Sequence, residues 1–279
     1  MRVFDDPRAF QAACLNARRT GDLGFVPTMG FLHQGHESLL RLAAGHASSA
    51  LSIFVNPTQF GPNEDLARYP RDLPGDLAKA ERCGIDLVLA PKEAEALYPS
   101  DFQTYVELGP LAATLEGALR PGHFRGMATV VLKLLALAQP THAYFGRKDF
   151  QQLAIVRRMA RDFDLPVEIV GAPIVREPDG LALSSRNVYL SPDERARALC
   201  LWRGQQAALA AVRTGERRAK ALELAARVEV EKGADRIDYV AVRDAESLQE
   251  IETATPRQAV ILFAAFVGKT RLIDNGLLE

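Results

Sequence analysis

Short apolar runs alternate with helix-like segments through the first two thirds of the chain, and this alternation limits the fold more than any other feature. The pattern predicts a strand at residues 23–26, a helix at 37–47 and a second strand at 50–55, which contains few polar residues. A strand buried on both faces is typical of a parallel sheet that helices cover. The three elements therefore predict a βαβ unit.

The same alternation continues for more than a hundred residues. It predicts helices and strands in turn at residues 66–83, 86–89, 128–138, 141–145, 150–163 and 167–170. Repeated βαβ units build an open parallel sheet with helices on both faces. We therefore expect an α/β fold with a Rossmann-like, doubly wound parallel sheet.

The sequence changes character after Asn187. Ser191 to Glu194 form a capping-box pattern with proline at the first helical position, and a long helix rich in Ala, Leu and Arg is expected to follow. A helix at 216–232 and apolar runs at 237–242 and 260–267 predict a smaller α+β C-terminal domain. We place the boundary near Val175, which gives domains 1–174 and 175–279.

Composition excludes several classes of protein. The 279 residues include 48% hydrophobic and 25% charged residues, and the net charge of −1 argues against a non-specific nucleic-acid partner but allows a site for a small anion. The three cysteines are too few and too far apart for a disulfide framework or a cysteine zinc site, which favours a cytoplasmic location. Apolar stretches at 128–137 and 259–267 are too short to cross a membrane, and the N-terminus lacks an export signal.

The segment Pro27 to His36 follows the first predicted strand and enters the first predicted helix. Such a position lies at the carboxyl edge of a parallel sheet, where helix amides bind anions. His33 and His36 flank Gly35, so both rings can donate to a phosphate that approaches the backbone closely. The alternative is that one histidine caps the helix and the other packs in the core, but the combination of spacing, glycine and topology favours phosphate.

Two further segments are candidates for phosphate binding. Gly146 to Asp149 lies between a predicted strand and a predicted helix, at the same edge of the sheet, so Lys148 can neutralise phosphate. Asp149 can contact ribose or assist a metal, and the alternative is that it caps the helix. Leu183 to Asn187 is expected to be a loop without secondary structure that carries two hydroxyls and a guanidinium. A solvated linker is the alternative for this loop, but the preceding Gly180 is a hinge candidate.

Two other segments are candidates for smaller polar ligands. Asn56 to Phe60 offers side-chain amides after the second strand, with a plain turn as the alternative, and the stretch 56–69 is long enough for a functional loop. Residues 120–126 form a basic, glycine-containing loop that suits a carboxylate or phosphate, or is a solvated turn. No GxGxxG motif occurs, which argues against a dinucleotide dehydrogenase, and Gly268-Lys269-Thr270 is predicted to be a strand end and turn rather than a P-loop.

Five segments occur in a family-specific order: VPTMGFLHQGH, SIFVNPTQFGPNEDLARYPRD, LEGALRPGHFRG, YFGRKDFQQL and VREPDGLALSSRN. Together they resemble the pantoate-β-alanine ligases, a family of the nucleotidylyltransferase superfamily. HQGH stands in the place of that superfamily's HIGH-like motif and ALSSRN in the place of its KMSKS-like loop. The resemblance spans nearly the whole chain and is weaker in the C-terminal part.

The resemblance implies a ligase that condenses pantoate with β-alanine through pantoyl adenylate, with release of AMP and pyrophosphate. ATP would be a substrate accompanied by Mg²⁺, whose protein ligands the resemblance does not identify. Residues 1–174 would bind nucleotide and pantoate, and residues 175–279 would form a lid domain. The family resemblance further implies a cytoplasmic homodimer whose partners are these small substrates, with no nucleic acid or membrane among them.

The resemblance also assigns roles by position. His36 would donate a proton and His33 would bind phosphate, with Lys148 and Arg186 completing the catalytic group. Gln59 and Gln152 would bind pantoate, and Gln59 would also contact β-alanine. The proposed ATP contacts are Met29, Gly30, Phe31, Leu32, His33, Gln34, Gly35, His36, Gly146, Arg147, Lys148, Asp149, Val175, Leu183, Ser184, Ser185 and Arg186. The chain departs from the family at Arg147, where glutamate is usual, and at Leu183, where methionine is common.

Two other functions are compatible with such a scaffold. Another adenylyl- or cytidylyltransferase of the superfamily would attach a nucleotide and stop, and it would have no use for the amides of Gln59 and Gln152. A non-catalytic nucleotide-binding protein would not need the full set of charged phosphate contacts. The acid-binding amides and the charged contacts therefore favour the ligase.

Overall fold

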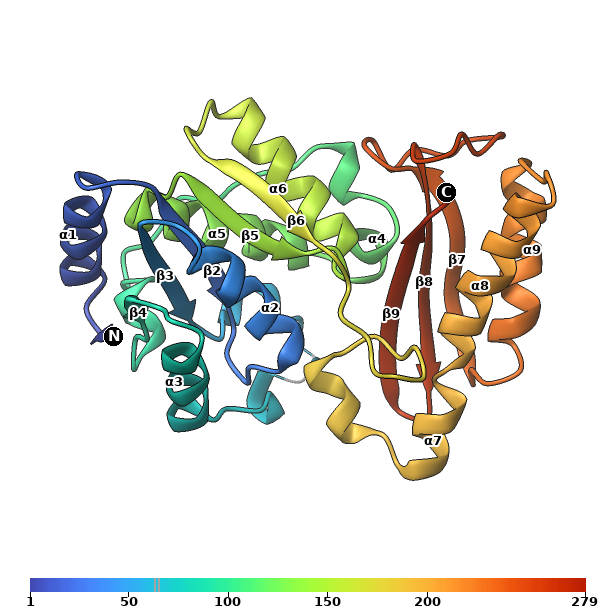
Figure 1. Cartoon of the computed structure of the whole chain (residues 1–279), viewed down its shortest axis with the longest axis horizontal. Coiled ribbons are helices and arrows are strands. Elements are labelled where there is room, and N and C mark those ends of the chain that lie inside the picture. Colours follow the sequence, from blue (N-terminus) through green and yellow to red (C-terminus); the bar gives the residue numbers. More distant parts are fainter. Residues whose placement is uncertain (63, 65) are drawn as a thin grey trace. The chain divides into compact units, whose positions relative to one another are not determined.

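A computed structural model describes residues 1–62, 64 and 66–279 of the chain. The chain forms two compact units, which Figure 1 shows in sequence colours. The first unit consists of Met1–Arg147 and Gln152–Pro173, and the second of Lys148–Gln151 and Ile174–Glu279. The division into functional domains 1–174 and 175–279 stays a prediction.

The first unit contains a six-stranded parallel sheet with the strand order β1-β4-β3-β2-β5-β6. The fold class predicted from the alternating pattern is confirmed. β2 pairs with β3 on one side and with β5 on the other, so the winding direction reverses at β2. Ligands of doubly wound sheets bind beyond the carboxyl ends of the strands at such a reversal. The strands are β1 (Arg2–Phe4), β2 (Leu23–Thr28), β3 (Ser48–Ile53), β4 (Leu87–Leu89), β5 (His142–Gly146) and β6 (Glu168–Ala172).

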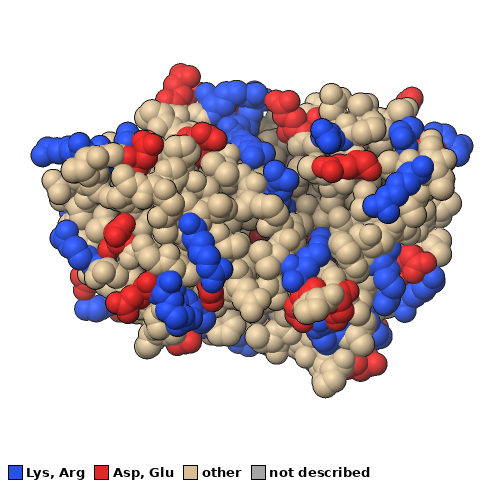
Figure 2. All heavy atoms as spheres, in the orientation of Figure 1, with Lys and Arg blue, Asp and Glu red and all other residues tan. Residues whose placement is uncertain are grey.

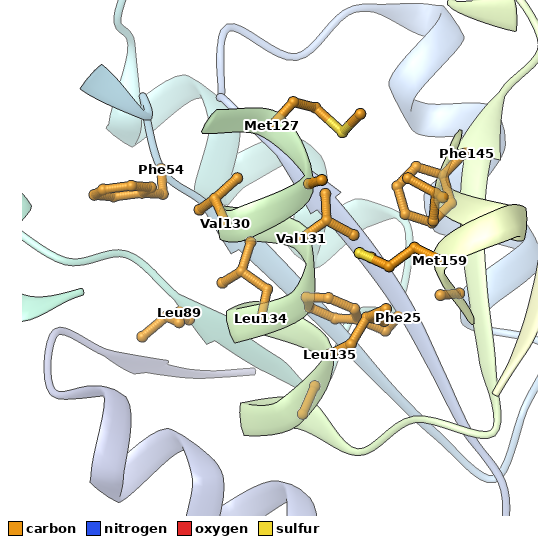
Figure 3. Packing of buried hydrophobic residues seen from close by; sticks show 14 of the residues in the cluster. Phe25, Phe54, Leu89, Met127, Val130, Val131, Leu134, Leu135, Phe145 and Met159 are labelled. Carbon is orange, nitrogen blue, oxygen red and sulfur yellow. The ribbon is translucent and has the colours of Figure 1, made fainter. Parts of the chain in front are cut away.

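Alternate residues of the strands face two separate hydrophobic clusters, as the two-residue period of a strand requires. Phe25 belongs to the cluster that contains α1, α5 and α6 residues, whereas Val26 belongs to the cluster that contains α2 and α3 residues. Figure 3 shows α5 side chains, Leu135 among them, packed beside Phe25 of the sheet. The helices of this part are α1 (Pro7–Arg18), α2 (Gln34–Ala43), α3 (Leu73–Arg82), α4 (Glu116–Leu119), α5 (His123–Ala138) and α6 (Phe150–Asp162), with short 3₁₀ helices η1 (Pro57–Gln59), η2 (Leu66–Arg68), η3 (Ala94–Ala96) and η4 (Pro110–Ala112).

The helix predicted at 66–83 is two elements, η2 and α3. Asp72 explains the break, because its non-helical backbone (φ −149°, ψ 67°) precedes α3 and its carboxylate accepts a hydrogen bond from the Gly75 amide at 3.0 Å. The loop predicted at 56–69 contains η1 and η2, and its residues Asn63 and Asp65 lie outside the described part of the chain. β1 and α1 were not predicted, and β1 has only three residues, which is too few to show a strand period.

The second unit is an antiparallel sheet with helices packed on it, which agrees with the predicted smaller α+β part (Figure 1). Its sheet has the order β7-β8-β9, and α8 and α9 pack against it and against each other. The Ser191–Glu194 capping box is present, but the long helix predicted after it is two helices, α7 and α8. The elements are η5 (Ser185–Tyr189), α7 (Pro192–Arg197), α8 (Cys200–Arg213), α9 (Ala219–Val230), β7 (Arg236–Asp244), β8 (Ala259–Val267) and β9 (Thr270–Leu277).

The P-loop-like tripeptide Gly268-Lys269-Thr270 contains the turn between β8 and β9. Gly268 adopts φ +58°, a left-handed conformation that glycine accepts without strain. The prediction of a strand end followed by a turn is confirmed.

The surface carries both signs of charge. Figure 2 shows basic and acidic side chains interspersed over the visible face. Among the described residues, no helix is long and apolar enough to cross a membrane.

Candidate active site

The HQGH segment begins α2 at the carboxyl end of β2. His33 is the N-cap residue, and its Nδ1 accepts a hydrogen bond from the Gly35 amide at 3.1 Å. His36 completes a capping box, because its Nδ1 accepts from the His33 amide at 3.3 Å. Both histidines therefore cap the helix, and neither is a core residue.

The capping contacts define which ring nitrogen carries the proton. An Nδ1 that accepts a hydrogen bond holds a lone pair, so the proton of each neutral ring is on Nε2. The rings of His33 and His36 lie together, with centroids 4.1 Å apart. Two half-buried Nε2–H donors at a helix N-terminus, where the helix dipole is positive, are suited to an anion.

The turn before this helix is held by Asp76 of α3. The Asp76 carboxylate is almost fully buried, and it accepts hydrogen bonds from the amides of Phe31 at 2.8 Å and Leu32 at 2.7 Å. Gly30 and Phe31 both adopt positive φ, +82° and +51°, which this clamp maintains. Burial raises the pKa of Asp76, although the two amides and Lys79 oppose the rise. Asp76 was not predicted, because its only signal in the sequence is a carboxylate on the buried face of a short helix.

The NPTQ turn lies beside the nucleotide candidate segment. Asn56 caps η1 and donates from Nδ2 to Gln59 Oε1 at 3.0 Å and to the Gly126 carbonyl at 3.2 Å. Gln59 is buried and donates from Nε2 to Met29 Sδ at 3.1 Å. The structure therefore brings together Met29 and Gln59, which were predicted to contact different substrates.

Gly126 of α5 explains how the helix approaches this turn so closely. A Cβ atom at this position would lie 2.1 Å from the Thr58 carbonyl oxygen and 2.7 Å from the Gln59 amide nitrogen. Any side chain would push the turn away from the helix. The backbone of Gln59 is therefore positioned by a glycine 67 residues later in the chain, which the local sequence pattern around Gln59 does not reveal.

The basic loop at 120–126 is engaged within the first unit. Arg120 makes a bidentate pair with Glu64, with both N–O distances 2.6 Å, and its Nη1 lies 3.1 Å from His123 Nε2. His123 Nδ1 is 2.8 Å from the Gln59 carbonyl, which accepts the Nδ1 proton while Nε2 accepts from Arg120. This loop was predicted to contact a carboxylate or phosphate, or to be a solvated turn, and in the structure its Arg120 contacts the internal carboxylate of Glu64.

The same network perturbs two pKa values. Burial works to raise the pKa of Glu64, but the hydrogen bond and charge of Arg120 outweigh it, so the pKa is lowered. Burial, reinforced by the positive charge of Arg120, lowers the pKa of His123 to about 4. His123 is therefore neutral at physiological pH and acts as a hydrogen-bonding link between Arg120 and Gln59.

The β5–α6 connection carries the next group of predicted residues. Gly146 ends β5, and Arg147 turns its side chain back along β6, where Nε donates to the Gly171 carbonyl at 3.0 Å. Lys148 Nζ lies 3.9 Å from Asp149 Oδ1, and the Lys148 carbonyl accepts from Asn275 Nδ2 at 2.8 Å within the second unit. The Arg147 side chain is therefore engaged by the backbone of β6.

Gln152 lies on α6 and is half-buried. Among the described residues its amide has no hydrogen-bond partner, so its donor and acceptor are available to a ligand.

The remaining predicted residues belong to the second unit. Val175 and Leu183 face each other across a tight hairpin, in which the Leu183 amide donates to the Val175 carbonyl at 3.0 Å. The segment predicted to be an unstructured loop contains η5, and Ser184 caps it by accepting from the Arg186 amide at 3.3 Å. Ser184, Ser185 and Arg186 are therefore at the N-terminus of a short 3₁₀ helix.

Arg176 anchors this hairpin. Its guanidinium makes a bidentate pair with Asp274 of β9, at 2.7 and 2.8 Å, and donates to the Gly180 carbonyl at 3.0 Å. Gly180 has φ +103°, and a Cβ atom there would lie 2.3 Å from the Trp202 ring. Close packing and backbone conformation thus require glycine at 180, a structural reason that is separate from the predicted hinge.

Comparison with known proteins gives one consistent result. The family model described as pantoate-beta-alanine ligase matches residues 2–277. A pantothenate synthetase from Roseiflexus sp. (strain RS-1) is 55% identical, and the alignment covers 100% of each chain. The pantothenate synthetase of Geobacter sulfurreducens is 50% identical over 100% of this chain and 99% of its own.

Solved structures agree with these relatives. The crystal structure of pantothenate synthetase from Thermus thermophilus superposes with a TM-score of 0.94 at 46% identity, covering 100% of this chain and 99% of the other. The pantoate-beta-alanine ligase from Francisella tularensis, complexed with beta-gamma ATP and beta-alanine, gives a TM-score of 0.80 at 33% identity and covers 99% and 97% of the two chains.

Proposed function

We infer the reaction steps from the premise that the chain belongs to the pantoate-beta-alanine ligase family, which makes it an ATP-dependent ligase of pantoate and β-alanine. In the first step the pantoate carboxylate attacks the α-phosphorus of ATP, which forms pantoyl adenylate and releases pyrophosphate. In the second step the amine of β-alanine attacks the acyl carbon, which forms the amide and releases AMP. Neither step needs a protein nucleophile, so the chain contributes positioning and charge stabilisation.

One contact supports this reaction most directly. Gln59 Nε2 donates to Met29 Sδ at 3.1 Å, which joins the segment proposed to bind ATP to the turn proposed to bind the acid substrate. A carboxylate held by Gln59 is then adjacent to the nucleotide segment, as attack on the α-phosphorus requires. The amides of Gln59 and Gln152 bind pantoate without changing their charge, and Gln59 also contacts β-alanine.

His36 and His33 act on the phosphates through Nε2. Their Nδ1 atoms are occupied by capping contacts, so each neutral ring points an N–H donor away from the helix backbone. His36 stabilises the leaving pyrophosphate as the proton donor, and His33 binds a neighbouring phosphate oxygen. Donors aimed at charge that develops in the transition state are the most effective kind.

The other ATP contacts follow the same chemistry. Lys148, Ser184, Ser185 and Arg186 supply charged and hydroxyl groups for the phosphates, and the Gly146, Val175 and Leu183 segments supply backbone groups. Mg²⁺ enters with ATP, since it keeps phosphate and water ligands and needs few from the protein. Asp149 can contact this ion, because its carboxylate is half exposed.

The adenylate step can be tested by isotope transfer. Pantoate labelled with ¹⁸O in its carboxylate is expected to pass one labelled oxygen to AMP, because the carboxylate oxygen that attacks phosphorus stays with AMP when the amide forms. Pyrophosphate release should need pantoate and ATP, and AMP release should need β-alanine as well. A nucleotidyltransferase that stops at the adenylate would not release AMP with β-alanine, and a non-catalytic binding protein would release neither product.

We further propose that the ligase is a cytoplasmic homodimer, as the family resemblance implies. Light scattering coupled to size-exclusion chromatography measures the mass directly, and a mass of one chain at micromolar concentration would contradict the dimer.

A further inference from the structure

Three titratable side chains meet at the amino edge of the parallel sheet. Asp22 immediately precedes β2, His46 lies between α2 and β3, and His142 begins β5. One nitrogen of each ring and one carboxylate oxygen of Asp22 all lie within 4.8 Å of one another. β2, which is six residues long and spans about 20 Å at roughly 3.3 Å per residue, lies between this cluster and the HQGH segment, so the cluster is not part of the ligase site.

The hydrogen bonds around His142 leave a lone pair on its outer nitrogen. The Thr141 hydroxyl donates to the Leu23 carbonyl at 3.1 Å, so towards His142 Nδ1, at 3.0 Å, it can only accept. Nδ1 therefore carries a proton, and in the neutral ring the lone pair that a metal can take is on Nε2. A second carboxylate, that of Glu168, has its Oε2 atom 3.4 Å from this Nε2.

His46 is held in place by its surroundings. Its Nε2 lies 2.7 Å from the Tyr144 hydroxyl, which leaves Nδ1 available, and its ring stacks on that of His142 with centroids 4.3 Å apart. A Cβ atom on Gly24 of β2 would lie 2.7 Å from the His46 ring, so the strand has a glycine where this ring packs.

We propose that Asp22, His46 and His142 bind a divalent transition-metal ion of the zinc type. Two imidazoles and one carboxylate are a common protein ligand set for zinc, with water in the remaining position. Hydrogen bonds donated by the second ring nitrogen, such as those to Tyr144 and Thr141, are typical of metal-binding histidines.

The ion would join segments that are far apart in the chain. Ligands of a tetrahedral zinc ion are about 3.3 Å apart, so the cluster must contract, and the exposed Asp22 is free to rotate inward. Because the three ligands come from the starts of β2 and β5 and from the loop before β3, the bound ion cross-links the central strands. It is a structural site that stabilises the first unit.

The test uses the full-length, tag-free protein without nucleotide. Co²⁺ is titrated while its visible absorption is recorded, Zn²⁺ is then added as a competitor, and the unfolding temperature is measured with and without Zn²⁺. We expect one bound ion per chain, displacement of Co²⁺ by Zn²⁺, and an unfolding temperature raised by roughly 5–10 °C at free Zn²⁺ about a hundredfold above its dissociation constant.

Variants identify the ligands. Asp22→Asn changes an exposed residue and leaves the fold intact, and it should weaken Zn²⁺ binding at least about tenfold, while His142→Gln should abolish it. The double variant His33→Asn, His36→Asn is the matched control, because it removes the other histidine pair and should keep the amino-edge ion. Zn²⁺ affinity that is unchanged in Asp22→Asn and His142→Gln, binding that is lost in the control, or the absence of binding and of a temperature shift would each overturn the proposal.

Discussion

His123 makes the stability of the first unit depend on pH in a predictable way. The ring is neutral in the folded chain because burial and Arg120 lower its pKa from 6.5 to about 4. Between these two values the unfolded chain binds a proton that the folded chain does not, so stability falls as the pH falls through this window. Above the unfolded pKa the two states bind the same number of protons at this site, and the effect vanishes.

The magnitude follows from the two pKa values. A shift from 6.5 to about 4 lowers the free energy of unfolding by about 2 kcal/mol between about pH 7.5 and about pH 5, and by about 3 kcal/mol at still lower pH. His123→Asn removes the titrating ring, while its amide can still donate to the Gln59 carbonyl in place of Nδ1. The variant should be less stable than the wild type at about pH 7.5, because Arg120 loses a partner, but it should lose about 2 kcal/mol less on acidification.

Urea denaturation followed by circular dichroism measures the free energy of unfolding at both pH values. Fluorescence of Trp202, the single tryptophan, reports the second unit and shows whether the two units unfold together. The relevant quantity is the loss of unfolding free energy between the two pH values, compared between wild type and variant. Other groups that titrate contribute equally to both proteins. Parallel losses of stability in wild type and His123→Asn would refute the neutral, buried histidine.

Three further predictions concern the reaction. His36→Asn keeps an acceptor for the capping amide but loses the Nε2–H donor, so pyrophosphate release should fall roughly 10²- to 10³-fold with little change in stability, whereas near-wild-type release would remove His36 from the mechanism. Gln59→Ala and Gln152→Ala should raise the KM for pantoate much more than the KM for ATP in steady-state assays, and an effect on ATP alone would refute their assignment to pantoate. Hydrogen exchange of amides 184–186 should slow when ATP and pantoate bind, and equal exchange with and without ligands would contradict their phosphate role.

The alternating pattern predicted the fold because buried parallel strands and their helices leave a strong periodic signal. It failed where a capping residue divides a helix, as Asp72 does before α3, and where β1 is too short to show a period. The candidate site was found through motifs that follow strands, such as the histidines of HQGH. Asp76 was missed, and His123 was predicted only as part of the basic loop at 120–126, since their roles depend on contacts with Phe31 and Gln59 that only the folded chain creates.

The contact between Gln59 and Met29 would couple the affinities of the chain for nucleotide and pantoate. If ATP changes the position of Met29, the Nε2 donor of Gln59 loses or strengthens its hydrogen bond to the Met29 sulfur. The donor is then more or less available to pantoate, so the affinities for nucleotide and pantoate are linked. Thermodynamic linkage is reciprocal, and pantoate must then alter ATP affinity by the same factor by which ATP alters pantoate affinity. A Met29→Leu substitution, which keeps the volume but removes the sulfur acceptor, would uncouple the two ligands while leaving both pockets in place.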